Sequence, residues 1–173
     1  AVKEKSDYYL KDNHTQWPGT GMMGDPTFDT FVKSQLQFAP PSTTLARPAA
    51  ISLLDTIGGP VILFAHSQGG GVAYEVAEAR PNQVKGMIIA EPGGSVRSPN
   101  FKYDPPITNV NQFSTYEAPP ERPGEEPCML QKDPVRKLVN YQNIPILNIS
   151  GNGGYHRAGD ACGPKWMNQA GAK

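Results

Sequence analysis

The segment from Val61 to Gly71 constrains the fold more than any other part of the chain. Five apolar residues, Val61 to Ala65, form a run of strand length, and glycines at 69–71 lead into a segment with apolar residues at helical spacing. A second apolar run, Gly86 to Ala90, follows the point where Arg80-Pro81-Asn82 ends that helix. Two buried strands joined by a helix form a β-α-β unit. The chain is therefore predicted to be an α/β protein with a mainly parallel sheet flanked by helices.

Weaker patterns predict the remaining elements. The first 48 residues are rich in Gly, Pro and Thr and are interpreted as an ordered loop with short helices. A helix is predicted from Arg47 to the stop signal Gly58-Gly59-Pro60. Further along, the patterns predict a short helix at Pro134–Leu138, a third strand at Ile144–Ile149 and a final helix at Gly163–Ala170.

The stretch 92–127 contains too much proline for regular elements and is predicted to be a long irregular excursion. Its aromatic residues, Phe101, Tyr103, Phe113 and Tyr116, favour a packed cap or a wall of the substrate pocket over a solvated linker. With 173 residues, the chain is expected to form a single domain, 1–173, with 92–127 as the cap or pocket loop.

Composition narrows the classes of partner. Sixteen Lys and Arg residues balance sixteen Asp and Glu residues, so no basic stripe predicts nucleic-acid binding. No apolar run approaches the roughly 20 residues that a membrane-spanning helix needs. The histidines and cysteines lack the spacing of metal ligands, and no nucleotide fingerprint follows the strands, so neither a metal nor a cofactor is expected.

Ser67 lies at the turn between the first buried strand and its helix. Ala65 and Gly69 supply the small residues that a sharp nucleophile elbow needs two positions on either side of the serine. In that geometry the hydroxyl stands at the C-terminal edge of the sheet, where the N–H of Gln68 can stabilise an oxyanion. An ordinary glycine-rich turn is the alternative. A phosphate-binding loop fits less well because no Gly-Lys-Ser/Thr follows.

Glu91 is the candidate for the acid that orients a catalytic base. It ends the second apolar strand, at the same edge of the sheet as Ser67, and a charge at that place needs a partner. Asp160 is the fallback acid. The base is less well defined: His66 adjoins the nucleophile, His14 precedes every element, and His156 has the right order in the chain but no following strand.

Cys128 and Cys162 are the two cysteines of the chain, and they suffice for one disulfide, with two unpaired thiols as the alternative. Two Asn-x-Ser/Thr sequons, at Asn13 and Asn148, also fit a secreted protein. Together these features favour an extracellular location.

Several motifs resemble those of α/β-hydrolase esterases from bacteria and fungi, in which the elbow reads His-Ser-Gln and the acid is a glutamate. The matching segments are His14-Thr15-Gln16-Trp17-Pro18-Gly19-Thr20-Gly21, Gly24-Asp25-Pro26-x-Phe28-Asp29, His66-Ser67-Gln68, Glu91-Pro92 and Tyr155-His156. The resemblance implies Ser67 as nucleophile and Glu91 as acid. Trp17, His66 and Tyr155 are expected to line the substrate pocket.

The resemblance also implies parts that this chain does not contain. Similar proteins begin with several strands and an oxyanion-hole loop, and end with a segment carrying the catalytic histidine. We therefore expect the chain to be a fragment or incomplete reading of a longer enzyme, with that histidine outside it. The predicted function is hydrolysis of a small-molecule carboxylic ester through an acyl-enzyme on Ser67. The alternatives are amide or thioester cleavage, or a non-catalytic binding protein on the same scaffold.

Overall fold

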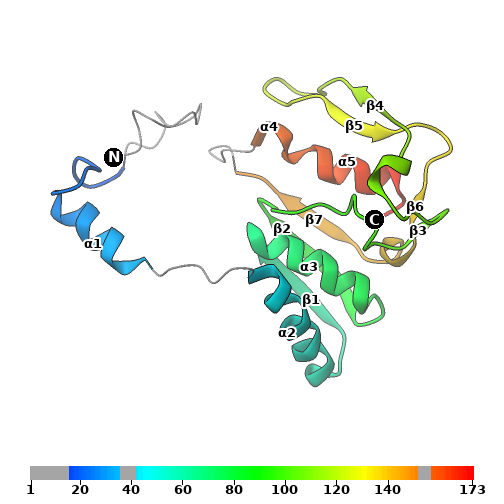
Figure 1. Cartoon of the computed structure of the whole chain (residues 1–173), viewed down its shortest axis with the longest axis horizontal. Helices are drawn as coiled ribbons and strands as arrows, with labels where there is room; N and C mark the ends of the chain where they lie inside the picture. The colour runs from blue at the N-terminus through cyan, green and yellow to red at the C-terminus, as the bar shows by residue number, and fades with distance from the viewer. Residues whose placement is uncertain (1–15, 36–41, 152–156) are drawn as a thin grey trace.

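A parallel sheet of three strands forms the centre of the molecule in a computed structural model, which describes residues 16–35, 42–151 and 157–173 (Figure 1). Its strand order is β1 (Val61–His66), β2 (Val84–Ala90) and β7 (Ile146–Ile149). Helix α3 (Gln68–Ala79) connects β1 to β2. The predicted β-α-β unit and the α/β class are confirmed, and the third strand lies where the sequence predicts it.

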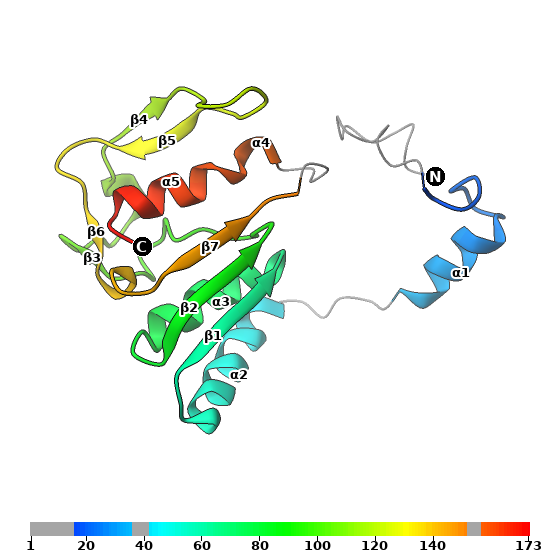
Figure 2. The ribbon, with the colours of Figure 1, turned by 180° about the vertical axis from the view of Figure 1, so that it is seen from behind.

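Helices cover one face of this sheet. Helices α2 (Ser42–Ile57) and α3 lie in front of the strands in Figure 1 and behind them in Figure 2. Helix α5 (Cys162–Gln169) contributes Trp166 and Met167 to the core on this side. The apolar residues of these helices share one core with β2, which includes Leu54, Val76, Met87, Ile89 and Trp166. Each such side chain contributes roughly 1.5–3 kcal/mol when it leaves water, so this face stabilises the arrangement of β1 and β2.

The other face of the sheet is uncovered in the described part of the chain. Figure 2 shows the strands from this side, with α2 and α3 behind them. Phe64 of β1 is 72% exposed and Leu147 of β7 is 56% exposed, and both lie in register with Ile88 of the central strand. Exposed large apolar side chains such as Phe64 and Leu147 are unusual for a parallel sheet, whose faces are normally both covered.

Helix α2 begins at Ser42, five residues before the predicted start at Arg47. Pro48 lies inside it and has no N–H to donate to the carbonyl of Thr44. Because Thr44 is exposed, water can satisfy that carbonyl, and the helix continues through the proline. It ends at Ile57 as predicted, with Gly58 at a φ of 70° and its N–H bonded to the Leu54 carbonyl.

The excursion 92–127 contains regular elements, so the prediction of a wholly irregular segment is wrong. Strand β4 (Thr115–Ala118) pairs with β5 (Cys128–Gln131) in an antiparallel hairpin, and η3 (Val110–Gln112) is a 3₁₀ turn. The prolines fall in the connections between these elements, where no ladder hydrogen bond is needed. Strand β3 (Tyr103–Asp104) pairs with β6 (Lys137–Leu138).

The helix predicted at Pro134–Leu138 is also wrong. Leu138 is extended because its N–H donates to the Ala170 carbonyl while β6 pairs with β3, and these two contacts hold the chain straight. The 3₁₀ turn η4 (Val139–Tyr141) follows. The last helical segment consists of α4 (Arg157–Asp160) and α5, and α5 is the predicted final helix.

Aromatic residues of the excursion pack into the main core. The ring centroid of Phe113 lies 4.9 Å from that of Tyr103 and 4.9 Å from that of Trp166, with both pairs edge to face. The Trp166 indole N–H donates to the Tyr103 hydroxyl at 3.0 Å. These residues therefore attach the excursion to α5, while its role as a cap or pocket loop stays a prediction.

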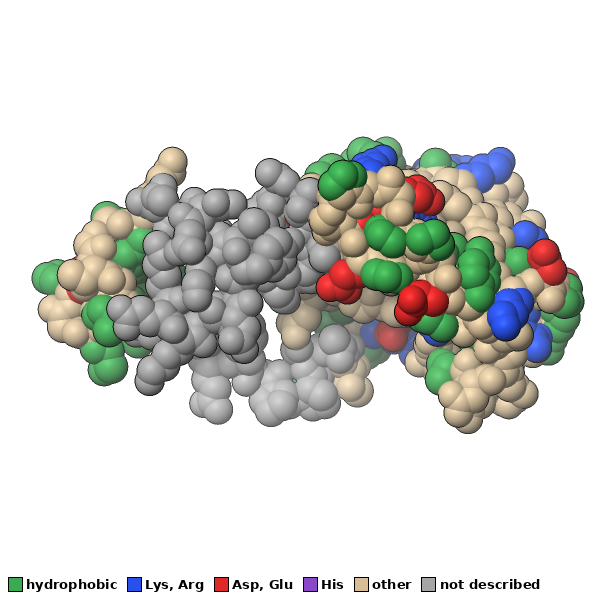
Figure 3. Space-filling model, turned by 90° about the horizontal axis from the view of Figure 1, so that it is seen from above, with side chains coloured by type: hydrophobic (Ala, Val, Ile, Leu, Met, Phe, Trp, Pro, Cys, Tyr) green, Lys and Arg blue, Asp and Glu red, His purple; other side chains and the backbone are tan. Residues whose placement is uncertain are grey.

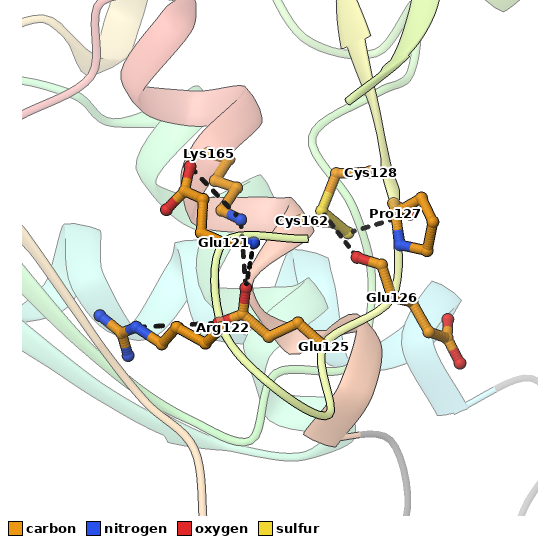
Figure 4. A network of polar contacts seen from close by, with 8 residues as sticks. All are labelled: Glu121, Arg122, Glu125, Glu126, Pro127, Cys128, Cys162 and Lys165. Carbon is orange, nitrogen blue, oxygen red and sulfur yellow. Dashed lines mark hydrogen bonds and ion pairs between the residues drawn. A yellow bond between two sulfur atoms is a disulfide. The ribbon is translucent and has the colours of Figure 1, made fainter. Parts of the chain in front are cut away.

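Cys128 and Cys162 form a disulfide that joins β5 to the first turn of α5 (Figure 4). Beside it, the Lys165 ammonium lies 3.5 Å from the Glu121 carboxylate and 3.3 Å from that of Glu125. Both contacts reach from α5 to the loop between β4 and β5. A covalent bond and two ion pairs thus hold the hairpin against α5.

The described surface carries mixed charges. Seen from above, acidic and basic side chains are scattered among hydrophobic and neutral ones (Figure 3). Among the described residues, no helix has both the length and the apolar character that spanning a membrane requires.

Candidate active site

Ser67 occupies a strained turn between β1 and α3. Its φ is 53° and its ψ is −125°, which a residue with a side chain rarely adopts. The Ser67 N–H donates to the Ala90 carbonyl at 3.1 Å, and the Ser67 carbonyl accepts from Gly70 at 2.9 Å. Strain of this kind costs roughly 1–3 kcal/mol and persists only where the surroundings enforce it. The sequence analysis predicts a nucleophile elbow at this position, and that role stays a prediction.

Glycines allow the elbow to pack tightly against the turn that follows β2. The Gly93 N–H donates to the Ser67 carbonyl at 2.7 Å. A Cβ on Gly70 would lie 3.1 Å from the Gly93 carbonyl oxygen, and one on Gly94 would lie 2.8 Å from the Gly71 Cα. The glycines after the serine therefore serve close contact between two turns.

Glu91 begins this second turn and is also strained. Its φ is 45°, and Ser67 and Glu91 are the non-glycine residues with positive φ in the described chain. The Glu91 N–H donates to the Ile149 carbonyl at 2.7 Å, and its Oε1 accepts from the Gly151 N–H at 3.0 Å. Because His66 lies opposite Ala90 in the β1–β2 register, Ser67 and Glu91 open neighbouring turns at one edge of the sheet.

His66 directly precedes Ser67 and lies opposite Ala90, the residue before Glu91. Its Nε2 is 3.7 Å from Glu91 Oε2, and its side chain is 62% exposed against 31% for Glu91. Within the part of the chain that the structure describes, no side chain makes a hydrogen bond with the Ser67 hydroxyl.

Gln68 is the first residue of α3, so its N–H has no partner within the helix. The nitrogen lies close to Gly93, on which an added Cβ would be 3.3 Å from it. The N-terminal end of a helix favours negative charge, which is the environment that an oxyanion needs.

The other residues predicted for the site are Trp17, Tyr155 and His156, with His14 as a further candidate base. Tyr155 and His156, and also His14, lie outside the described residues. Trp17 packs edge to face against Phe28 and Phe31 of α1 (Pro26–Ser34), with ring centroids 6.3 and 5.4 Å away. Its place in a substrate pocket stays a prediction.

Asp160, the fallback acid, ends α4 and lines a cavity of about 560 Å³ with Ser150 and Lys165. Glu91 Oε2 lies 3.7 Å from Nε2 of His66, the residue before Ser67. No group of three or more potential metal ligands occurs among the described residues.

The contacts of Gly93, Gly94 and Gly151 were missed from the sequence. The motif Glu91-Pro92-Gly93-Gly94 gave a signal for a tight turn, but nothing in it indicated that the turn packs on the elbow. Gly151 follows β7 and supplies an N–H to the acid, which the glycine-rich run 151–154 does not reveal.

Comparison with known proteins identifies the class. The model of the alpha/beta hydrolase family matches residues 13–145, so the chain belongs to that family. It is 34% identical over 178 residues to a protein named probable secreted lipase phiG, from a fungus of strain ATCC 74256. That match covers 91% of this chain and 49% of the relative.

A second relative is lipase LipV of Mycobacterium tuberculosis, strain ATCC 25618 / H37Rv. It is 44% identical over 57 residues, which are 32% of this chain and 22% of that protein. The chain thus spans about half or less of the length of these relatives. No solved structure matches it significantly.

Proposed function

We propose that this chain carries the nucleophile and the acid of a serine-dependent carboxylic ester hydrolase. The observation that supports it best is the pair of strained turns, in which Ser67 and Glu91 both have positive φ and open adjacent turns at the C-terminal edge of the sheet. Strain at two neighbouring polar residues is typical of active sites. The names of the two relatives, both lipases, support an ester as substrate.

In the proposed mechanism, the Ser67 hydroxyl attacks the ester carbonyl and a histidine takes its proton. This histidine is expected outside the chain, and His156, which is not among the described residues, is the candidate within it. The Glu91 carboxylate orients the imidazole and stabilises it when it becomes protonated. The Gln68 N–H donates to the oxyanion, the alcohol leaves with the proton, and water then cleaves the acyl-enzyme on Ser67.

Two observations support an extracellular location for the proposed hydrolase. A disulfide joins Cys128 and Cys162, which fits an oxidising compartment, and one relative carries the word secreted in its name. The proposed triad would also cleave amides and thioesters, so matched substrates are part of the test.

Steady-state hydrolysis of p-nitrophenyl esters, with the matched amide and thioester, tests the proposal. Ser67→Ala should abolish turnover. Glu91→Gln keeps the shape and the acceptor for Gly151 but removes the charge, and should lower kcat at least about a hundredfold. Two controls, Ser52→Ala and Glu117→Gln, change exposed residues of the same types on α2 and β4 and should leave kcat unaltered. Turnover that survives Ser67→Ala would refute the proposal.

A further inference from the structure

The imidazole of His66 faces the carboxylate of Glu91 at the C-terminal edge of the sheet. His66 Nε2 lies 3.7 Å from Glu91 Oε2, which is within the range of an ion pair when the imidazole is protonated. His66 is the last residue of β1 and lies opposite Ala90, the last residue of β2. The pairing of the two strands therefore places His66 beside the turn that Glu91 begins.

The second oxygen of the same carboxylate is held from another element. Glu91 Oε1 accepts the Gly151 N–H at 3.0 Å, just beyond the end of β7. A Cβ on Gly151 would overlap Glu91 Oε1, so a side chain here would require the carboxylate to move. The Gly151 N–H and the His66 imidazole thus face the two oxygens of the Glu91 carboxylate.

We infer that His66 is a positioning residue for Glu91, which rests on the proposed role of Glu91 as the triad acid. A glutamate side chain has three rotatable bonds, and Glu91 is partly open to solvent, at 31% exposed. The single hydrogen bond from Gly151 to Oε1 still allows the Glu91 carboxylate to rotate about that contact. An attractive group at Oε2 limits the rotation, so that the carboxylate keeps the orientation in which it can receive the imidazole of the base.

The solvent exposure of His66 determines how strongly its contact with Glu91 can affect catalysis. His66 is 62% exposed, so water screens its attraction to the carboxylate. The contact of an exposed pair corresponds to about a two- to fivefold effect on a rate or an equilibrium. Loss of a catalytic base would instead lower the rate by several orders of magnitude, so the two roles differ clearly in size.

Three variants separate these roles. His66→Gln keeps an N–H donor at a reach similar to that of Nε2 but cannot act as a base. His66→Leu removes both the N–H donor and the ability to act as a base. Phe64→Leu, on the same uncovered face of β1, is the control for a change in that surface.

In ester hydrolysis, His66→Leu should lower kcat about two- to fivefold with KM unchanged, and His66→Gln should restore most of the loss. Phe64→Leu should not reproduce the effect. If the kcat of His66→Leu and that of His66→Gln both equal the wild-type value, the inference is overturned. It is also overturned if both fall to the level of Ser67→Ala, because His66 would then be the base.

A second measurement does not depend on turnover. Hydrogen exchange of the Gly151 amide reports the contact with Glu91 Oε1, since an amide that is bonded to a fixed carboxylate is protected. His66→Leu should lower this protection about two- to fivefold, and His66→Gln should not. Unchanged protection in His66→Leu would overturn the positioning role. Absence of hydrolysis by the wild type, together with the expected exchange pattern, would refute only the ester hydrolase proposal.

Discussion

Gly94 is the position where a single methyl group tests the packing of the two strained turns. Its φ is 92°, and a Cβ there would lie 2.8 Å from the Gly71 Cα and 3.3 Å from the Gly71 nitrogen. Both atoms belong to the backbone of α3, so relief requires one turn to move. The positive φ costs alanine about 1–2 kcal/mol, and overpacking adds about 1–3 kcal/mol. Gly94→Ala should therefore destabilise the fold by about 2–5 kcal/mol.

Gly58→Ala is the matched control, because it tests the cost of a positive φ without a close contact for the added Cβ. Gly58 has a φ of 70°, and the nearest atoms to an added Cβ lie 3.9 and 4.0 Å away. This variant should lose only about 1–2 kcal/mol. Denaturant unfolding followed by circular dichroism measures both, and the midpoint should fall without a change in slope.

The two variants should also differ at the active site. Gly94→Ala should slow the reaction of Ser67 with substrate, because the displaced turn includes Gly93, whose N–H holds the Ser67 carbonyl. Gly58→Ala should leave that rate alone. Equal losses of stability in the two variants would refute the argument that the glycines serve the contact between the turns.

Two further predictions concern the core and the disulfide. Burial raises the pKa of Tyr74 and of Tyr103 to about 12, so the stability that these groups contribute is present below pH 10 and is lost as pH rises toward 12. The loss should be about 1.4 kcal/mol per pH unit for each tyrosine, and alkaline unfolding of Tyr→Phe variants checks it: a slope that these variants do not reduce would contradict the assignment. Replacing Cys128 and Cys162 by serine opens a loop of 34 residues and should lower the free energy of unfolding by about 4 kcal/mol on the chain-entropy model. An unfolding midpoint unchanged by the double replacement would show that the ion pairs of Lys165 hold the hairpin alone.

The elements of the central sheet could be predicted because their signals are local. The run Val61–Ala65 and the run Gly86–Ala90 are apolar throughout, and both form strands, although Ile62 and Phe64 of the first run are exposed. The stop at Gly58 is equally local, since only a residue without a side chain readily takes a φ of 70°. Ser67 and Glu91 followed from their places at the ends of these strands.

The features that were missed depend on contacts between distant segments. Whether Lys137–Leu138 is a helix or a strand is decided by β3 and by the Ala170 carbonyl, about 30 residues away on either side. The early start of α2 places Pro48 inside the helix, whereas the sequence pattern predicted a helix that begins beside this proline. The hairpin of β4 and β5 is fixed by pairing and by the disulfide, whereas its proline content indicated a loop.

The two strained turns show the same limit within the site. The motif around Ser67 predicted the turn at Ser67. The close approach of Gly93 and Gly94 to that turn and to the start of α3 results from the β1–β2 pairing. The contact between His66 and Glu91 also arises from strand register and carries no pattern in the sequence. Residues 152–156, which include His156, lie outside the described structure, so the identity of the base stays a prediction.

Mass spectrometry of the folded protein after reaction with a fluorophosphonate tests the central claim most directly, because a stable adduct forms only on an activated serine. The account predicts one adduct, located on the peptide that contains Ser67, and its loss in Ser67→Ala. It also predicts slower labelling in Glu91→Gln with the fold intact by circular dichroism. A folded protein that forms no adduct, or forms it on another serine, would contradict the account.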